Sequence, residues 1–180
     1  MNPNDIVEII PHLFISNWDT SNNPIILQKY NIKAVVSLET LPKPTNTLIY
    51  YDKHNIDHIY IHIGDHPSEN ISQHFDRTYD FINRHISNGE NIIVHCMAGI
   101  SRSASIILNY ILRNTYENNQ AYTCPCKLFQ NVLSYARSKR PILNPNMGFQ
   151  KQLLQKAIEY QQESDRQQNY NKNQKSINIY

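Results

Sequence analysis

The sequence predicts an α/β fold in which a central, mostly parallel, twisted sheet is flanked by helices. Three observations predict it. Short apolar runs of strand length alternate with segments whose apolar residues recur at helical spacing. The chain has 180 residues, 40% of them hydrophobic, which suits one domain with a substantial core. The expected order (strand, helix, strand, strand, helix, strand, helix) is typical of a mostly parallel sheet finished by a helical cluster.

Turn and cap residues separate the expected elements. Pro11 divides the first two strands, Asn23 and Pro24 suit the start of a helix, and Asn88 and Gly89 suit the end of the next one. The predicted strands are 7–10, 13–15, 33–38, 58–63 and 91–95. The predicted helices are 25–30, 75–86, a segment containing 106–111, 128–138 and 147–160, with loops at 39–47 and 113–126.

The last part of the chain has a different composition from the rest. From Gln161 onward it consists almost wholly of polar residues and tyrosine, with little to bury. Such a segment is expected to be disordered. We therefore expect one catalytic domain over residues 1–160 and a polar tail over 161–180.

Charge and composition restrict the possible partners. The formal net charge is only +2, so no nucleic acid is expected as a partner. No run approaches the roughly 18 consecutive apolar residues of a spanning helix, so no membrane span is expected. Three cysteines are too few for a disulfide framework, and the N-terminus lacks the pattern of a secretory signal. These features favour an intracellular, cytoplasmic setting.

Residues 95–103, HCMAGISRS, connect a predicted buried strand to a predicted helix. Backbone N–H groups at a helix N-terminus lack intrahelical partners and, curled into a nest, can bind a phosphate. Gly99 allows the turn, and the planar guanidinium of Arg102 can bind two phosphate oxygens. The residues expected to surround the phosphate are Met97, Ala98, Gly99, Ile100, Ser101 and Arg102.

Cys96 lies at the base of this expected phosphate site. A thiol beside a helix N-terminus and an arginine is driven toward thiolate. Such a thiolate could attack phosphorus in line and form a cysteinyl phosphate that water then hydrolyses. The Ser103 hydroxyl can donate to the thiolate. His95 can support the loop through its ring, but we expect no direct proton transfer by it, because its side chain should point away from the site.

The leaving group needs a proton from a carboxylic acid on another loop. Asp65 follows the strand predicted at 58–63, and the carboxyl ends of parallel strands gather at the rim where Cys96 also emerges. We expect Asp65 to act as general acid and then as base toward water. Asp57 and Asp76 suit this role less well, because one precedes its strand and the other falls within a helix.

The loop resembles the HCxxGxxR[ST] signature of cysteine-dependent protein tyrosine phosphatases, and its AG and SRS resemble the small, single-domain dual-specificity branch, which includes viral enzymes. The resemblance extends over about residues 5–160. Residues 65–72, DHPSENIS, are similar to the acid loop of that branch. Residues 138–149 resemble its C-terminal motif, which implies that Asn146 supports the phosphate loop. The resemblance implies hydrolysis of phosphotyrosine and phosphoserine or phosphothreonine in protein partners, without metal or cofactor.

Other functions stay open beside the leading one. The same chemistry could act on a phosphoinositide or an RNA 5′ phosphate. The resemblance argues against a highly charged substrate, because family members that act on inositol lipids often carry lysine inside the loop, where this chain has Met97 and Ile100. A phosphate-binding pseudophosphatase would require the loss of the nucleophile, the arginine or the acid, and all three are present.

Two features outside the loop have competing interpretations. Cys124 and Cys126 could bind a metal or protect Cys96 as a disulfide, but without a second ligand pair we expect two ordinary thiols. The basic residues within 137–140 could attract a phosphorylated partner, or could form a solvated helix face with one arginine anchored structurally.

Overall fold

The computed structural model describes residues 5–118 and 124–177, in which five strands form one sheet of order β1-β2-β5-β3-β4. The strands are β1 (Ile6–Ile10), β2 (Leu13–Ser16), β3 (Ile32–Glu39), β4 (Asp57–His62) and β5 (Asn91–His95). β1 pairs antiparallel with β2, and all other pairings are parallel. The predicted α/β architecture with a mostly parallel sheet is therefore confirmed.

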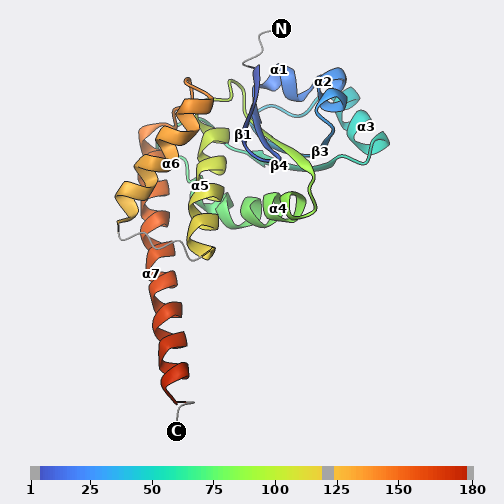
Figure 1. Ribbon diagram of the computed structural model, residues 1–180. Helices are drawn as coiled ribbons and strands as arrows, with labels where there is room; N and C mark the ends of the chain where they lie inside the picture. The colour runs from blue at the N-terminus through green and yellow to red at the C-terminus, as the bar shows by residue number, and fades with distance from the viewer. Residues whose placement is uncertain (1–4, 119–123, 178–180) are drawn as a thin grey trace.

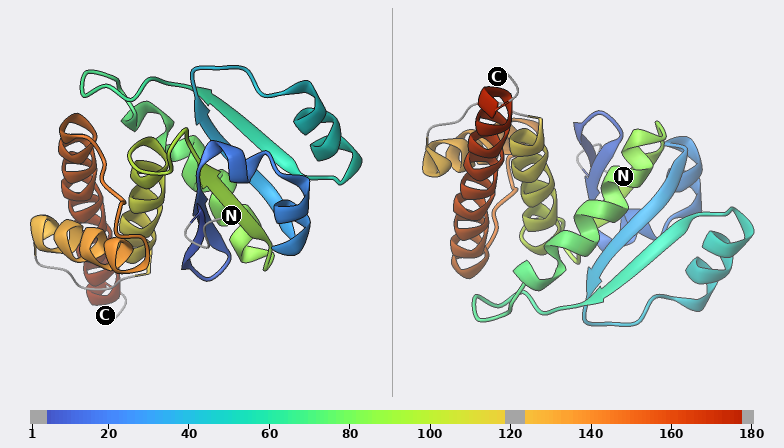
Figure 2. Two further views of the ribbon diagram at one scale, coloured as in Figure 1. Left: turned by 90° about the horizontal axis from the view of Figure 1, so that it is seen from above. Right: turned by 90° about the horizontal axis from the view of Figure 1, so that it is seen from below.

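Helices cover both faces of this sheet, as Figures 1 and 2 show. The helices are α1 (Trp18–Ser21), α2 (Pro24–Lys29), α3 (Thr45–Lys53), α4 (Phe75–Ser87), α5 (Arg102–Glu117), α6 (Pro125–Lys139) and α7 (Met147–Ile177), with a short 3₁₀ helix η2 (Ser72–His74) before α4. The smaller core lies between the sheet and α2 and α3, and the larger core lies between the sheet and α4 to α7.

The central strands have continuous apolar runs because both of their sides are buried. In β3, Val35 joins the smaller core while its neighbour Val36 joins the larger one. In β5, Ile93 and Val94 divide in the same way. A central parallel strand with two covered faces needs such a run instead of an alternating pattern. The burial fixes the register of β5, from whose end the loop of residues 96–101 emerges.

Cap residues place several helices where the sequence predicts them. Asn23 accepts a hydrogen bond from the Ile25 N–H, and Pro24 is the first residue of α2. Helix α3 was not predicted from the sequence, and its first residues fall within the loop expected at 39–47. The helix has few buried residues, so its apolar pattern is weak. The described part of α5 reaches Glu117, so the expected loop at 113–126 begins later. Residues 119–123 of that loop lie outside the described residues.

Helix α7 continues well beyond the expected end of the domain. The tail from residue 161 was expected to be disordered, yet α7 runs unbroken to Ile177 and extends away from the rest of the protein (Figure 1). Gln, Glu, Lys and Arg all have good helix propensity, so a polar segment can prolong a helix that the core has nucleated. A hydrogen bond from Gln161 Nε2 to Asp165 Oδ1, of 2.8 Å, adds to this extension. Within the described residues, no helix combines the length and apolar character needed to cross a membrane.

Candidate active site

The thiol of Cys96 lies at the bottom of the loop between β5 and α5. The residue is 1% exposed, and Sγ lies 3.3 Å from the Ser103 hydroxyl oxygen. Burial favours the neutral thiol, but the Ser103 hydroxyl, the backbone N–H groups of Ser103 and Ile100, and the Arg102 charge outweigh it. Together they lower the pKa of Cys96 below its ordinary value. The loop therefore favours a buried thiolate.

Backbone contacts shape the loop above this thiol. Gly99 has a φ of +66°, and a Cβ there would lie 2.6 Å from the carbonyl oxygen of Ser16. No other residue type fits this position without moving β2. The Trp18 N–H donates to the Met97 carbonyl over 3.1 Å, which ties the loop to α1. The loop is thus held on the side of the N-terminal strands.

Arg140 holds the loop from the end of α6. Its Nε donates to the Gly99 carbonyl over 2.9 Å, and its Nη2 donates to the Ala98 carbonyl over 3.3 Å. The residue is 3% exposed. Of the two interpretations of the basic residues at 137–140, the anchored arginine describes Arg140. Lys139, its neighbour, is exposed.

Arg102 begins α5 and lies beside the loop. Its Nη1 donates to the Ile63 carbonyl over 3.1 Å, which fixes the guanidinium plane against the end of β4. Its Nε is buried, and no hydrogen-bond partner for it exists among the described residues. A buried donor without a partner is costly, and a bound oxyanion would satisfy it.

Asp65 lies on the loop after β4, above the phosphate loop. Its Oδ1 accepts hydrogen bonds from the Ser101 hydroxyl over 2.6 Å and from Asn146 Nδ2 over 2.9 Å. Its Oδ2 lies 3.9 Å from Arg102 Nε. The two rival carboxylates are engaged elsewhere. Asp57 pairs with Arg84, and Asp76 is one of the partners of an arginine on α5.

Asn146 joins the start of α7 to both loops. Its backbone N–H donates to the Ser101 hydroxyl over 3.1 Å, and its Oδ1 accepts from the Phe149 N–H as a helix cap. Gly148 follows in the first turn, where a Cβ would lie 1.9 Å from the Pro67 carbonyl oxygen. This contact requires glycine, because the acid loop lies directly on the helix backbone.

The side chain of His95 points beneath the loop, away from the proposed phosphate site. Its Nδ1 lies 3.4 Å from the Cys96 carbonyl oxygen, and its Nε2 lies 2.7 Å from the Ser37 hydroxyl oxygen. Burial and the charge of Lys43 lower the pKa of His95 well below its ordinary value. The ring is therefore a neutral support at neutral pH.

Sequence reasoning missed three contacts of the site. It did not assign Arg140 to the loop carbonyls, Ser101 as a partner of Asp65, or the buried pair Glu39 and Lys43 that lies beneath His95. The partners of Asp65, of the loop carbonyls and of His95 lie 36 to 56 positions away along the chain, so spacing along the chain does not reveal them. Glu39 and Lys43 are only four positions apart, but the sequence does not show that the pair is buried beneath His95. Glu39, which ends the apolar strand β3, was the one available signal. A carboxylate buried beside such a strand requires a partner of opposite charge.

Cys124 and Cys126 lie far from Cys96. They occur at the first turn of α6, whereas Arg140 contacts the loop from the other end of that helix. At 1.5 Å per residue, about 20 Å of helix separates these ends. All three cysteines are free. A disulfide to Cys96 does not fit this arrangement.

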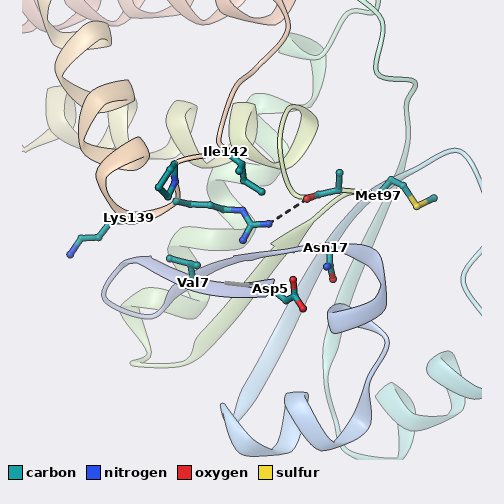
Figure 3. A pocket seen from close by; sticks show the side chains of 9 residues that line it. Asp5, Val7, Asn17, Met97, Lys139 and Ile142 are labelled. Atoms are coloured by element: carbon teal, nitrogen blue, oxygen red, sulfur yellow. Dashed lines mark hydrogen bonds between the residues drawn. The ribbon is translucent and has the colours of Figure 1, made fainter. Parts of the chain in front are cut away.

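A pocket of about 430 Å³ lies beside the phosphate loop (Figure 3). Its lining residues are Asp5, Val7, Asn17, Met97, Ala98, Lys139, Arg140, Pro141 and Ile142. Most of these contribute apolar surface. The charged side chains that line it are the Asp5 carboxylate, the Lys139 ammonium and the Arg140 guanidinium, of which Arg140 is held by the loop carbonyls.

The fold and the loop after β5 define a protein of the cysteine-dependent protein tyrosine phosphatase class. The family model for the dual specificity phosphatase catalytic domain matches residues 13–159, and the chain belongs to that family. The family predicted from the signature is thus confirmed.

Individual relatives agree with this assignment. Dual specificity protein phosphatase 22 of Xenopus tropicalis is 33% identical over 150 residues, which are 83% of this chain and 64% of that protein. Dual specificity protein phosphatase 15 of Mus musculus is 31% identical over 150 residues, 83% of this chain and 57% of that protein. The chain thus matches about three fifths of each relative's length. The crystal structure of DUSP15 has a TM-score of 0.75 at 29% identity, covering 91% of this chain and 94% of that one.

Proposed function

We propose that the protein is a dual-specificity phosphatase that hydrolyses phosphotyrosine and phosphoserine or phosphothreonine through a cysteinyl phosphate. One observation carries the proposal. A thiol with a lowered pKa and a buried arginine with an unpartnered N–H lie in one loop, and a carboxyl group from a separate loop after β4 lies beside them. Phosphoryl transfer from an ester needs a nucleophile, a cation for the equatorial oxygens and an acid for the leaving group.

The first step uses the substrate-facing side of the loop. The phosphate dianion occupies the nest of N–H groups between Met97 and Arg102, and Arg102 Nε gains the acceptor that it lacks. The Cys96 thiolate attacks phosphorus in line, and the bond to the substrate oxygen breaks. Asp65, protonated for this step, gives its proton to the leaving oxygen.

The second step regenerates the thiolate. Asp65, now a carboxylate, takes a proton from a water molecule as that water attacks phosphorus. The bond from phosphorus to Sγ breaks, and the Ser103 hydroxyl stabilises the departing thiolate from 3.3 Å. Ser101 and Asn146 keep Asp65 above the loop through both steps.

Phosphorylated proteins are the substrates that the family implies, and the surroundings of the loop support them. The neighbouring pocket is mostly apolar, which favours apolar side chains of a protein substrate over the additional phosphates of a phosphoinositide. We also place the protein in a reducing, intracellular setting, because a thiolate nucleophile is inactivated by oxidation.

Phosphate release from matched phosphotyrosine and phosphothreonine peptides, with EDTA present, tests the proposal. Wild type should act on both peptides, and Cys96→Ser should lose at least about 10⁴-fold in kcat. Asp65→Asn should also lose activity, because it lacks the proton donor. Asp76→Asn is its matched control, because it removes a carboxylate on α4 that pairs with an arginine away from the loop. Folded, reduced wild type that releases phosphate from neither peptide would overturn the proposal, and phosphoinositide and RNA 5′ phosphate would be tried next.

A further inference from the structure

A buried polar cluster lies beneath the phosphate loop, on the side away from the proposed substrate site. Lys43 Nζ lies 2.8 Å from Glu39 Oε1 and 2.8 Å from His95 Nε2. The side chains of these residues are 2%, 1% and 0% exposed. Trp18 Nε1 donates to the other carboxylate oxygen of Glu39 over 3.2 Å. The ion pair is therefore enclosed, and its charges act on the ring of His95 with little screening.

The position of Lys43 determines which nitrogen of His95 carries hydrogen. An ammonium group has three donors and no acceptor, so it can approach His95 Nε2 only where that nitrogen presents a lone pair. Burial lowers the pKa of Lys43 below its ordinary value, and the hydrogen bond and charge of the Glu39 carboxylate at 2.8 Å act against this shift and favour the ammonium form. A neutral ring with an unprotonated Nε2 carries its hydrogen on Nδ1, which faces the Cys96 carbonyl oxygen at 3.4 Å.

We propose that Lys43 is a positioning residue whose ammonium keeps His95 in the neutral Nδ1–H form, so that the ring supports the phosphate loop at the Cys96 carbonyl. The role rests on the proposed function, because the loop it positions is the proposed catalytic loop. Lys43 itself contacts Glu39 and His95 and touches neither the thiol nor the phosphate site.

Other charged and titratable groups also face this ring. Glu39 Oε1 lies 3.2 Å from Nε2 and favours a protonated ring. Lys43, His58 and Arg102 oppose protonation through their charges, and His58 is joined to the ring through the Ser37 hydroxyl. Burial, followed by Lys43, lowers the pKa of His95 the most. Loss of Lys43 therefore removes the nearest positive charge and leaves the Glu39 carboxylate, at 3.2 Å, as the nearest charged group to Nε2, beside the Ser37 hydroxyl at 2.7 Å.

The wild-type protein provides the first test. Long-range ¹H–¹⁵N spectra of the ¹⁵N-labelled full chain report the protonation of each histidine nitrogen, with His95 assigned by loss of its signals in His95→Asn. At neutral pH we expect a protonated Nδ1 and an unprotonated Nε2. A proton on Nε2 would overturn the proposal. The spectrum needs neither a variant nor activity, so an inactive wild type would contradict the proposed function without deciding this test.

Lys43→Met provides the second test, with Lys53→Met as the matched control at the exposed end of α3. With the Glu39 carboxylate left as the nearest charged group, His95 should gain a proton at Nε2 and become an imidazolium. The midpoint of Cys96 alkylation by iodoacetamide should then move to lower pH, because an imidazolium one residue away favours the thiolate. Lys53→Met should match wild type in both measurements. A folded Lys43→Met protein with an unchanged ring and an unchanged midpoint would overturn the proposal, and the wild-type spectrum decides if that variant does not fold.

Discussion

The two sides of the phosphate loop are held by different kinds of contact. On the substrate side, Asp65, Ser101 and Asn146 form hydrogen bonds at a partly exposed rim, where Asp65 has 36% of its side chain exposed. On the other side, His95 and Arg140 support the loop from almost complete burial. The residues at the rim can therefore exchange hydrogen-bond partners during a reaction. The contacts of His95 and Arg140 cannot change without disturbing the core.

Among the residues that surround the loop, the largest expected effect comes from removing the Asp65 acid at the rim. Asp65→Asn should lower kcat for a phosphothreonine peptide by about 10²–10⁴-fold, the range typical of general acid catalysis. The decrease should be smaller for phosphotyrosine, because a phenolate, with a pKa of about 10 for its acid, leaves more easily than an alkoxide. Steady-state kinetics on the two peptides measure both numbers. An equal loss on both peptides would contradict the assignment of Asp65 as the proton donor.

Removing a support contact should reduce stability more than it reduces a single chemical step. Arg140→Ala leaves the Gly99 and Ala98 carbonyls without their donor, and should lower the free energy of unfolding by about 1.5–3 kcal/mol. Lys139→Ala, at the exposed neighbour, should change it by less than about 0.5 kcal/mol. Urea unfolding compares the two variants. Equal values for both would show that Arg140 does not support the loop.

A smaller effect is expected from Ser103, whose hydroxyl helps to lower the pKa of the Cys96 thiol. Ser103→Ala removes the hydroxyl that donates to Sγ, so the pKa of Cys96 should rise from its lowered value. Since the thiolate is the reactive form and is populated above that pKa, kcat/KM should fall most at acidic pH and recover as the pH rises. The pH dependence of Cys96 alkylation checks the direction. A midpoint that moves to lower pH would contradict this role of Ser103.

The smallest effect is expected from the polar end of α7. Tyr160, whose hydroxyl donates to Asn109 Oδ1 over 2.9 Å, is the last side chain of the larger core. A chain ending after Tyr160 should keep its peptide kinetics and lose less than about 0.5 kcal/mol of unfolding free energy. This outcome would support the proposed domain over residues 1–160. A large loss of stability would place part of the helix beyond residue 160 within the folding unit.

Local patterns predicted much of the fold and the loop. The apolar run of β5 followed by HCMAGISRS indicated a strand, a phosphate loop and a helix, because the chemistry and the backbone demands lie within nine adjacent residues. The extended α7 was not predicted, because a polar composition fits both disorder and a solvated helix. Arg140 could not be placed at the loop carbonyls, nor Lys43 and Glu39 beneath His95, since these contacts join residues far apart along the chain. Only the packing of β3, α6 and the loop brings them together.

The covalent intermediate at Cys96 is the most direct test of the proposed mechanism. Wild type mixed with a phosphotyrosine peptide and quenched in acid within one turnover would be digested and mapped by mass spectrometry. One phosphate should be found on Cys96 at early times and disappear as inorganic phosphate forms. It should persist longer in Asp65→Asn, which lacks the base for hydrolysis. Turnover without phosphate on Cys96, or with phosphate on another residue, would contradict the mechanism.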